Sequence, residues 1–157
     1  MKNNTICLTM IVKNESKIIT RLLDSVFNII DYWVICDTGS TDGTQKIIKD
    51  FFQKKNILGE LHQRKWINFG YNRTESIDLS KGKSDYLLLL DADMILINNN
   101  FEKKNLIHDF YIIKQQNPEI EYYNTRLIKS ELDWKCIGVT HEYYGVSNKI
   151  NNDLSSE

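Results

Sequence analysis

The run Tyr86–Leu90 is the feature that most limits what this chain can fold into. It is continuously apolar and stops abruptly at Asp91-Ala92-Asp93. A short apolar run bounded by polar residues is typical of a strand buried on both faces, as in a parallel sheet. Ligands of open α/β sheets bind beyond the carboxyl ends of such strands. The run therefore predicts an α/β fold and puts two acidic side chains where a site is expected.

Strand-like and helix-like segments alternate up to this point. The predicted strands are Thr5–Val12, Tyr32–Cys36, Ile57–His62 and Asp85–Asp91. Apolar residues at helical spacing predict helices over Ser16–Ile29, after Thr44 (Ile47, Ile48, Phe51 and Phe52) and over Tyr71–Leu79. This alternation predicts a mostly parallel central sheet flanked by helices.

The pattern changes after Asp93. Three segments rich in β-branched and aromatic residues predict strands that form a mixed or antiparallel extension of the same sheet: Ile107–Lys114, Glu121–Lys129 and Trp134–Tyr144. We expect residues 1–146 to form a single domain and the polar residues 147–157 to form a disordered tail.

Composition excludes several classes of protein. The 157 residues suffice for one compact domain. The 20 basic and 21 acidic residues leave no basic stripe, so nucleic-acid binding is not expected. No apolar stretch approaches ~20 residues, so no membrane span is expected. Cys7 and Cys36 fall in predicted strands, which indicates buried thiols in a reducing compartment, the cytoplasm.

The spacing of Asp91 and Asp93 predicts a divalent-metal site. In an extended chain, residues two positions apart point the same way, so the two carboxylates converge. They repel each other unless a cation lies near them. Ala92 between them is small and leaves room for a ligand.

The segment Asp37–Thr44 is a turn rich in glycine and small hydroxyl residues between a strand and a helix. Such a turn can bind a nucleotide, with Asp37 accepting hydrogen bonds from the base or ribose. The alternative is a well-capped turn without a ligand. Asn14 and Glu15 follow the first strand and lie at the same edge, where they either contact a ligand or cap the next helix.

Two further positions carry chemistry. Arg73 near the carboxylates could bind a pyrophosphate, or be a solvated helix residue. In His141-Glu142, the histidine could ligate a metal and the glutamate could serve as a general base. A single histidine is otherwise more often structural.

Taken together, these residues resemble family 2 glycosyltransferases of the GT-A fold, over about Thr5 to Tyr144. The resemblance rests on Met10–Glu15, Asp37–Thr44, Trp66 with Phe69 and Arg73, Leu90–Asp93, Arg126 and Gly138–Glu142. It implies a GT-A-like nucleotide-binding sandwich, a nucleotide-sugar donor that is usually a UDP-sugar, and a divalent cation, Mn²⁺ or Mg²⁺.

The resemblance also implies roles for individual residues. The implied donor-binding residues are Val12, Asn14, Glu15, Asp37, Thr38, Arg73, Asp91 and Ala92. Asp93 would be the main metal ligand, with Asp91 and His141 as further ligands. Asp93 and Glu142 would be catalytic, with Glu142 as the base in an inverting transfer to an acceptor hydroxyl.

Two other functions stay open. The segment after Asp93 is compact for an acceptor site, so the chain could be a non-catalytic nucleotide-sugar-binding module, or a truncated donor-binding domain of a larger enzyme with a further C-terminal domain. A nucleotidyltransferase ranks last, because such enzymes usually carry a glycine-rich basic loop where this chain has Lys13–Ser16. The acceptor, whether glycan, protein or another hydroxyl compound, is not identified by the sequence.

Overall fold

The structure is a computed structural model in which residues 3–138 and 142–147 are described. Its helices are α1 (Ile19–Val26), α2 (Thr44–Lys55) and α3 (Phe69–Ser80), with a 3₁₀ turn over Lys103–Asn105. Its strands are β1 (Ile6–Val12), β2 (Tyr32–Asp37), β3 (Gly59–Gln63), β4 (Tyr86–Leu89), β5 (Phe110–Gln116), β6 (Glu121–Lys129), β7 (Trp134–Ile137) and β8 (Tyr143–Val146).

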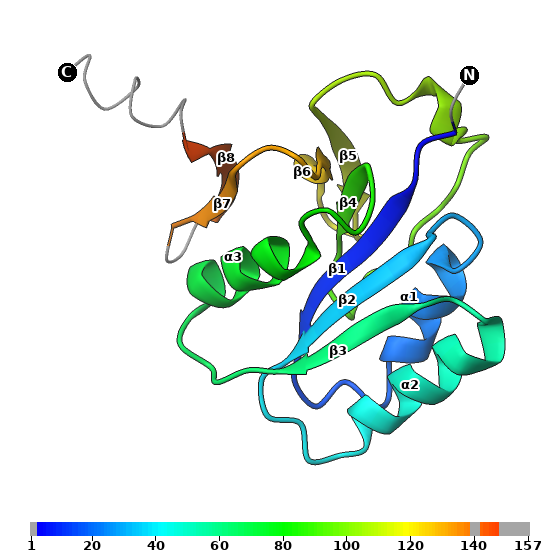
Figure 1. Ribbon diagram of the computed structural model, residues 1–157, viewed down its shortest axis with the longest axis vertical. Helices are drawn as coiled ribbons and strands as arrows, with labels where there is room; N and C mark the ends of the chain where they lie inside the picture. Colours follow the sequence, from blue (N-terminus) through cyan, green and yellow to red (C-terminus); the bar gives the residue numbers. More distant parts are fainter. Residues whose placement is uncertain (1–2, 139–141, 148–157) are drawn as a thin grey trace.

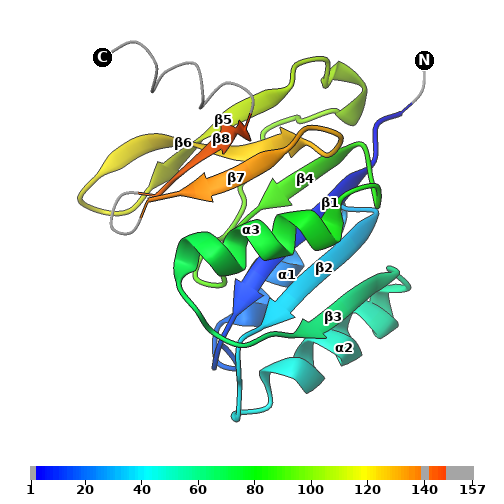
Figure 2. The same ribbon diagram turned by 60° about the vertical axis from the view of Figure 1, so that its left-hand side comes forward.

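Six strands form one sheet in the order β3-β2-β1-β4-β6-β5, seen from two sides in Figures 1 and 2. β3, β2, β1 and β4 are parallel, whereas β6 runs antiparallel to both of its neighbours. Val12 at the end of β1 pairs with Asp37 at the end of β2, and Thr9 pairs with Leu89 of β4. The predicted α/β fold, mostly parallel with antiparallel strands in its C-terminal part, is confirmed.

Alternate residues of β1 face two different layers. Ile6, Leu8 and Met10 are buried in a cluster with α1 and α2, whereas Cys7 is buried in a second cluster with Ile77 of α3. The figures accordingly show α1 and α2 on one face of the sheet and α3 on the other. Because both faces are covered, the strands read as continuous apolar runs.

The prediction of one strand over Trp134–Tyr144 is wrong. β7 and β8 pair antiparallel and form a separate two-stranded sheet, so this segment does not extend the main sheet. Gly138, with φ of 108°, follows β7 in a conformation that side chains disfavour, so it favours the end of the strand there. β7 packs on α3 instead, where the Cys136 N–H donates to Thr74 Oγ1 at 3.0 Å.

Helix α1 is shorter than the predicted helix Ser16–Ile29. The backbone N–H of Glu15 donates to Thr44 Oγ1 at the start of α2, and that of Ser16 donates to Asp42 Oδ2 in the loop that follows β2. The chain therefore follows that loop before it enters the helix at Ile19.

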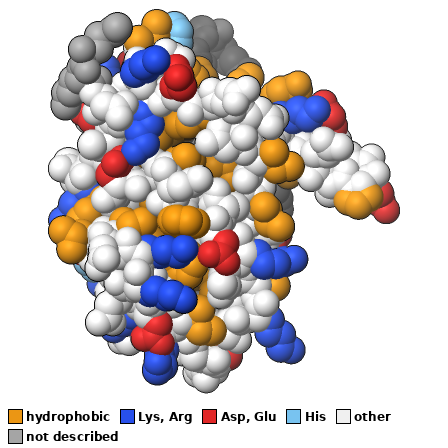
Figure 3. Space-filling model, turned by 90° about the vertical axis from the view of Figure 1, so that its right-hand side faces the viewer, with side chains coloured by type: hydrophobic (Ala, Val, Ile, Leu, Met, Phe, Trp, Pro, Cys, Tyr) orange, Lys and Arg blue, Asp and Glu red, His pale blue; other side chains and the backbone are white. Residues whose placement is uncertain are grey.

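The outer end of the β5–β6 hairpin stands out from the body of the molecule (Figures 2 and 3). Its outer residues are exposed, including Ile120 and Tyr123, whereas Leu127 and Ile128 next to β4 are buried. The inner end of the hairpin therefore belongs to the core and can form one wall of a site.

All three cysteines are buried and unpaired. Within the described residues, no helix has the length and apolar character that crossing a membrane requires. Ser147 donates from its N–H to the Asp133 carbonyl at 3.0 Å. The rest of the predicted tail lies outside the described residues, so the domain boundary and the cytoplasmic location stay predictions.

Candidate active site

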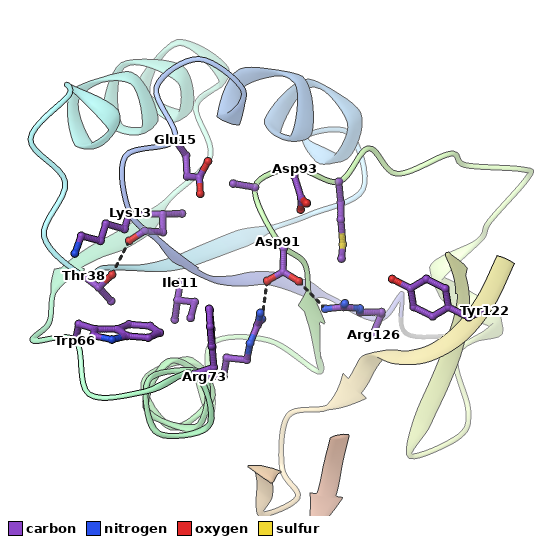
Figure 4. Close-up of a pocket in the computed structure, with 14 residues that line it drawn as sticks. Ile11, Lys13, Glu15, Thr38, Trp66, Arg73, Asp91, Asp93, Tyr122 and Arg126 are labelled. Atoms are coloured by element: carbon purple, nitrogen blue, oxygen red, sulfur yellow. Dashed lines mark hydrogen bonds and ion pairs between the residues drawn. The ribbon is translucent and has the colours of Figure 1, made fainter. Parts of the chain in front are cut away.

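A cavity of about 650 Å³ lies at the edge of the sheet where β1, β2 and β4 end. Figure 4 shows the side chains that surround it. Of the predicted site residues, those that line it are Val12, Glu15, Thr38, Arg73, Asp91, Ala92 and Asp93. Asn14, Asp37 and Glu142 lie outside its lining, and His141 lies outside the described residues. The position matches the ligand site of open α/β sheets.

The loops after β1 and β2 are joined by hydrogen bonds. Asn14 has a left-handed backbone with φ of 57°. Its N–H donates to Ser40 Oγ at 2.8 Å, and its side-chain oxygen accepts from the Thr41 N–H at 2.8 Å. The Glu15 N–H donates to Thr44 Oγ1 at 2.8 Å. Asn14 therefore links the two loops, and the backbone N–H of Glu15 fixes that residue to Thr44.

Asp37 organises the turn after β2 and keeps one oxygen unused. Its Oδ1 accepts from the N–H groups of Gly39 at 2.9 Å and Ser40 at 2.8 Å. Its Oδ2 is buried and has no hydrogen-bond partner within residues 3–138 and 142–147. A buried oxygen without a donor is costly. Asp37 thus organises the turn and keeps one carboxylate oxygen without a donor among the described residues.

Asp91 and Asp93 have different surroundings. Asp91 Oδ1 lies 2.6 Å from Arg73 Nη1, and its Oδ2 lies 3.3 Å from Arg126 Nη1. Figure 4 shows both contacts as dashed lines. Asp93 is exposed and makes no hydrogen bond or ion pair with any described residue. The predicted pair is therefore divided into a carboxylate neutralised by arginines and a carboxylate that is open to a ligand.

Glu15 faces this group of carboxylates from the loop after β1. Burial raises the pKa of Glu15, and the negative charges of Asp93, Asp42 and Asp91 raise it further. A cation near Glu15 and Asp93 would relieve this repulsion. No three or more His, Cys, Asp or Glu side chains of the described chain are grouped so that they could hold a metal ion.

Arg73 connects Asp91 to the segment before β8. Its Nε lies 3.0 Å from Glu142 Oε2, and its guanidinium carbon lies 5.6 Å from the centre of the Phe69 ring. Glu142 Oε1 is buried without a hydrogen-bond partner among the described residues. Burial raises the pKa of the nearby Tyr144 to about 12, although the charge of Arg73 lowers it in part. Among the described residues, Glu142 is therefore connected to the cavity lining through Arg73.

An aromatic wall lines the cavity on the side of the loop before α3. The rings of Trp66 and Phe69 meet edge to face at 4.8 Å, and both remain partly exposed. The buried side chain of Asn72 accepts from the Ile67 N–H at 2.9 Å and donates to the Lys65 carbonyl at 3.0 Å. The loop is therefore fixed while its rings are available to a planar or sugar ring.

A β-bulge directs Arg126 into the cavity. Tyr111 and Ile112 of β5 pair with Leu127 and Thr125 of β6, so Arg126 between them has no opposite residue. A bulge interrupts the alternation of side chains along a strand and re-aims one of them. This brings a nearly buried arginine to the site from a strand far along the sequence.

The cavity includes side chains that were not among the predicted site residues, among them Lys13, Met94, Tyr122 and Arg126. Lys13 and Met94 are next to predicted motifs, and that adjacency could have found them. Arg126 had only the family resemblance as a signal. Tyr122 had none, because its place depends on how β6 pairs with β4 and β5.

Comparison with known proteins gives a family. Residues 7–104 match the family described as "Glycosyl transferase family 2". The chain is 34% identical over 128 residues to the SPbeta prophage-derived glycosyltransferase SunS of Bacillus subtilis (strain 168). The match covers 78% of this chain and 29% of SunS, so the chain spans about three tenths of the length of this relative.

One of the similar solved structures shares the fold. A mannosyltransferase of Pyrobaculum calidifontis, PcManGT, in complex with GDP-Man and Mn²⁺, superposes with a TM-score of 0.52 at 16% identity, over 60% of this chain and 29% of that one. TarS of S. aureus, in complex with UDP, gives a TM-score of 0.48 at 24% identity, over 57% of this chain and 27% of that one. The likeness to PcManGT is one of fold.

Proposed function

Because the chain belongs to glycosyl transferase family 2, we propose that its cavity binds a nucleotide-sugar donor, a UDP-sugar, and passes the sugar to an acceptor hydroxyl. The observation that carries this proposal is that Glu15, Arg73, Asp91 and Asp93 meet in one cavity at the ends of parallel strands. The chain spans 29% of SunS, so the activity and acceptor of a whole enzyme are part of the proposal.

The nucleoside is proposed to lie at the end of β2. The unused Oδ2 of Asp37 is an acceptor for a base or ribose donor. The backbone N–H and Oγ1 of Thr38 both donate to the Val12 carbonyl, at 2.9 and 3.1 Å, which fixes Thr38 in the cavity wall. A buried polar atom without a hydrogen-bond partner, such as Asp37 Oδ2, is stabilised most when a ligand donates to it, and this supports the placement.

Asp93 is proposed to hold a divalent cation, Mn²⁺ or Mg²⁺, with Glu15 as the nearby carboxylate. Hard cations of this kind prefer carboxylate oxygens, and the free carboxylate of Asp93 suits them. When bound, such a cation supplies positive charge that stabilises the leaving diphosphate. Both carboxylate oxygens of Asp91 contact arginines, so its proposed role is to orient Arg73 toward the diphosphate. His141 stays a predicted ligand.

Glu142 is proposed as the general base of an inverting transfer. The acceptor oxygen attacks the anomeric carbon, the bond from that carbon to the diphosphate oxygen breaks, and the base takes the hydroxyl proton. Glu142 is bound to Arg73 and does not line the cavity. To act as base it has to exchange this contact for the acceptor hydroxyl.

Calorimetric titration of UDP and GDP, each with and without Mn²⁺, tests the donor site. We expect one nucleotide to bind in a metal-dependent way, and Asp93→Ala to abolish that binding and donor hydrolysis while leaving the fold intact. Asp24→Ala is the matched control, because Asp24 is an exposed carboxylate on α1 that does not line the cavity. Unchanged turnover in Asp93→Ala, or no binding of either nucleotide, would contradict the proposal.

A second candidate is a module that binds a nucleotide sugar without transferring it. The position of Glu142 outside the cavity lining favours it, because the proposed base then does not face an acceptor in the cavity. This candidate predicts metal-dependent nucleotide binding without donor hydrolysis or transfer. Hydrolysis above background that Glu142→Gln removes would decide for the transferase.

A further inference from the structure

Asp91 is held from two sides by arginines that come from different parts of the chain. Arg73 on α3 contacts one oxygen at 2.6 Å, and Arg126 on β6 contacts the other at 3.3 Å. The side chains of Arg73 and Arg126 are 15% and 8% exposed, so both contacts are shielded from water. Removing one partner of such a group leaves a charge that is hard to satisfy.

Arg126 is itself fixed in place. Its Nε donates to Gln115 Oε1 at 3.1 Å, and its Nη1 also lies 3.4 Å from the Leu89 carbonyl. The Gln115 amide nitrogen in turn lies 3.7 Å from Met94 Sδ. Because arginine only donates, its neighbour must turn the amide oxygen toward it, and this orients Gln115. The bulge in β6 is what allows this arrangement.

Arg73 is held differently. It lies on a helix that ends at Ser80, and among the described residues its side chain has, besides Asp91, an ion pair with Glu142 in which its Nε makes no hydrogen bond, and a contact with the face of Phe69. Its Nη1 is the nitrogen that the Asp91 carboxylate holds at the cavity. The direction of the Arg73 guanidinium therefore depends on where Asp91 points.

We propose that Arg126 is a positioning residue, which acts through Asp91 to hold Arg73 toward the diphosphate of the donor. The inference rests on the proposed function, in that Arg73 is taken to bind the diphosphate. Gln115 is the second element of the brace, because it fixes Arg126 without contacting Asp91 or Arg73.

A double-mutant cycle separates positioning from direct contact with the ligand. The probe is the nucleoside diphosphate that binds the unaltered protein, titrated with Mn²⁺. Arg126→Gln should raise its Kd roughly ten- to hundredfold, the size of a lost charge-assisted hydrogen bond. In an Arg73→Gln background the same change should raise Kd less than about threefold, since the residue it positions is gone. Equal effects in both backgrounds would overturn the proposal.

Lys114→Gln is the matched control for the loss of charge. Lys114 lies on β5 of the same hairpin, pairs with Glu121 at 2.8 Å and does not line the cavity. It should leave Kd unchanged. Gln115→Leu is the second variant, in case Arg126→Gln unfolds. It should raise Kd by a smaller factor, and no change in a folded Gln115→Leu would count against the brace.

Hydrogen exchange of Arg73 in the nucleotide-free protein tests the positioning by Arg126 independently of donor binding. In protein labelled with ¹⁵N-arginine, the Nη–H groups of Arg73, one of which contacts Asp91, are assigned by their loss in Arg73→Lys. Their hydrogen exchange should be slow in the unaltered protein and in Lys114→Gln, and at least about tenfold faster in Arg126→Gln, since exchange reports local opening. Unchanged exchange would overturn the proposal. Faster exchange in a protein that binds no nucleotide would support the positioning and contradict the donor site.

Discussion

Replacing Thr44 with valine removes the hydroxyl that joins the two loops beside the cavity. Thr44 is fully buried at the start of α2. Its Oγ1 accepts from the Glu15 N–H at 2.8 Å and donates to Asp42 Oδ1 at 2.6 Å. Valine keeps the shape of the side chain, so the change removes two hydrogen bonds and no volume.

The expected loss in the free energy of unfolding is about 2–3 kcal/mol. Each hydrogen bond contributes on the order of 1 kcal/mol net, and a backbone N–H left without an acceptor adds about 1 kcal/mol or more. Thr44→Ser keeps the hydroxyl and removes only a methyl group, which costs about 1 kcal/mol. The difference between the two variants isolates the hydrogen bonds from the packing.

Urea unfolding followed by tryptophan fluorescence measures both variants. The midpoint should fall with an unchanged denaturant slope, because the surface exposed on unfolding stays the same. The Glu15 amide should exchange faster in Thr44→Val than in Thr44→Ser, since only valine removes its acceptor. If Thr44→Val is as stable as Thr44→Ser, the hydroxyl does not join the loops and the reasoning is refuted.

Two further predictions concern stability. An added Cβ at Gly59 would lie 2.3 Å from atoms of the Trp33 ring, so Gly59→Ala should lower the free energy of unfolding by about 2–3 kcal/mol. Thermal unfolding checks this, with Leu58→Ala at an exposed neighbour as control, and a Gly59→Ala protein as stable as the control would contradict it. Burial raises the pKa of Cys7 and Cys36 from about 9 to about 12 in the folded protein, while the unfolded thiols ionise from about pH 9. The contribution of these neutral thiols to the free energy of unfolding is therefore fully present below about pH 9 and is lost as pH rises toward about 12. Cys7→Val should make this decrease in the free energy of unfolding less steep. An equally steep decrease in that variant would contradict the prediction.

Local patterns determined most of the fold of this protein. Continuous apolar runs such as Tyr86–Leu90 mark strands buried on both faces, and their alternation with amphipathic helices leaves a parallel sheet as the simple solution. Because parallel strands end at one edge, the same patterns put Glu15, Thr38 and Asp91 at a common cavity. These features depend on periodicity along the chain, which a sequence displays directly.

The C-terminal part depended on contacts that the sequence does not display. Gly138 was the local sign of a break within Trp134–Tyr144, but a single glycine in a strand pattern does not say whether the segment extends the main sheet or pairs with itself as β7 and β8. The surface of α3 decided it, where Cys136 hydrogen-bonds to Thr74 instead of a main-sheet strand. Tertiary context outweighs β propensity in such segments.

The site, too, combines features that are local in the sequence with features that depend on tertiary contacts. The sequence by itself determined that two carboxylates follow β4, because the spacing of Asp91 and Asp93 is local. Only the tertiary structure decided that Asp91 is held by Arg73 and Arg126 while Asp93 stays open, and that Glu142 lies behind Arg73. Those contacts join α3, β6 and the segment before β8, and their geometry is set by strand register and a bulge, which arise from packing between distant parts of the chain.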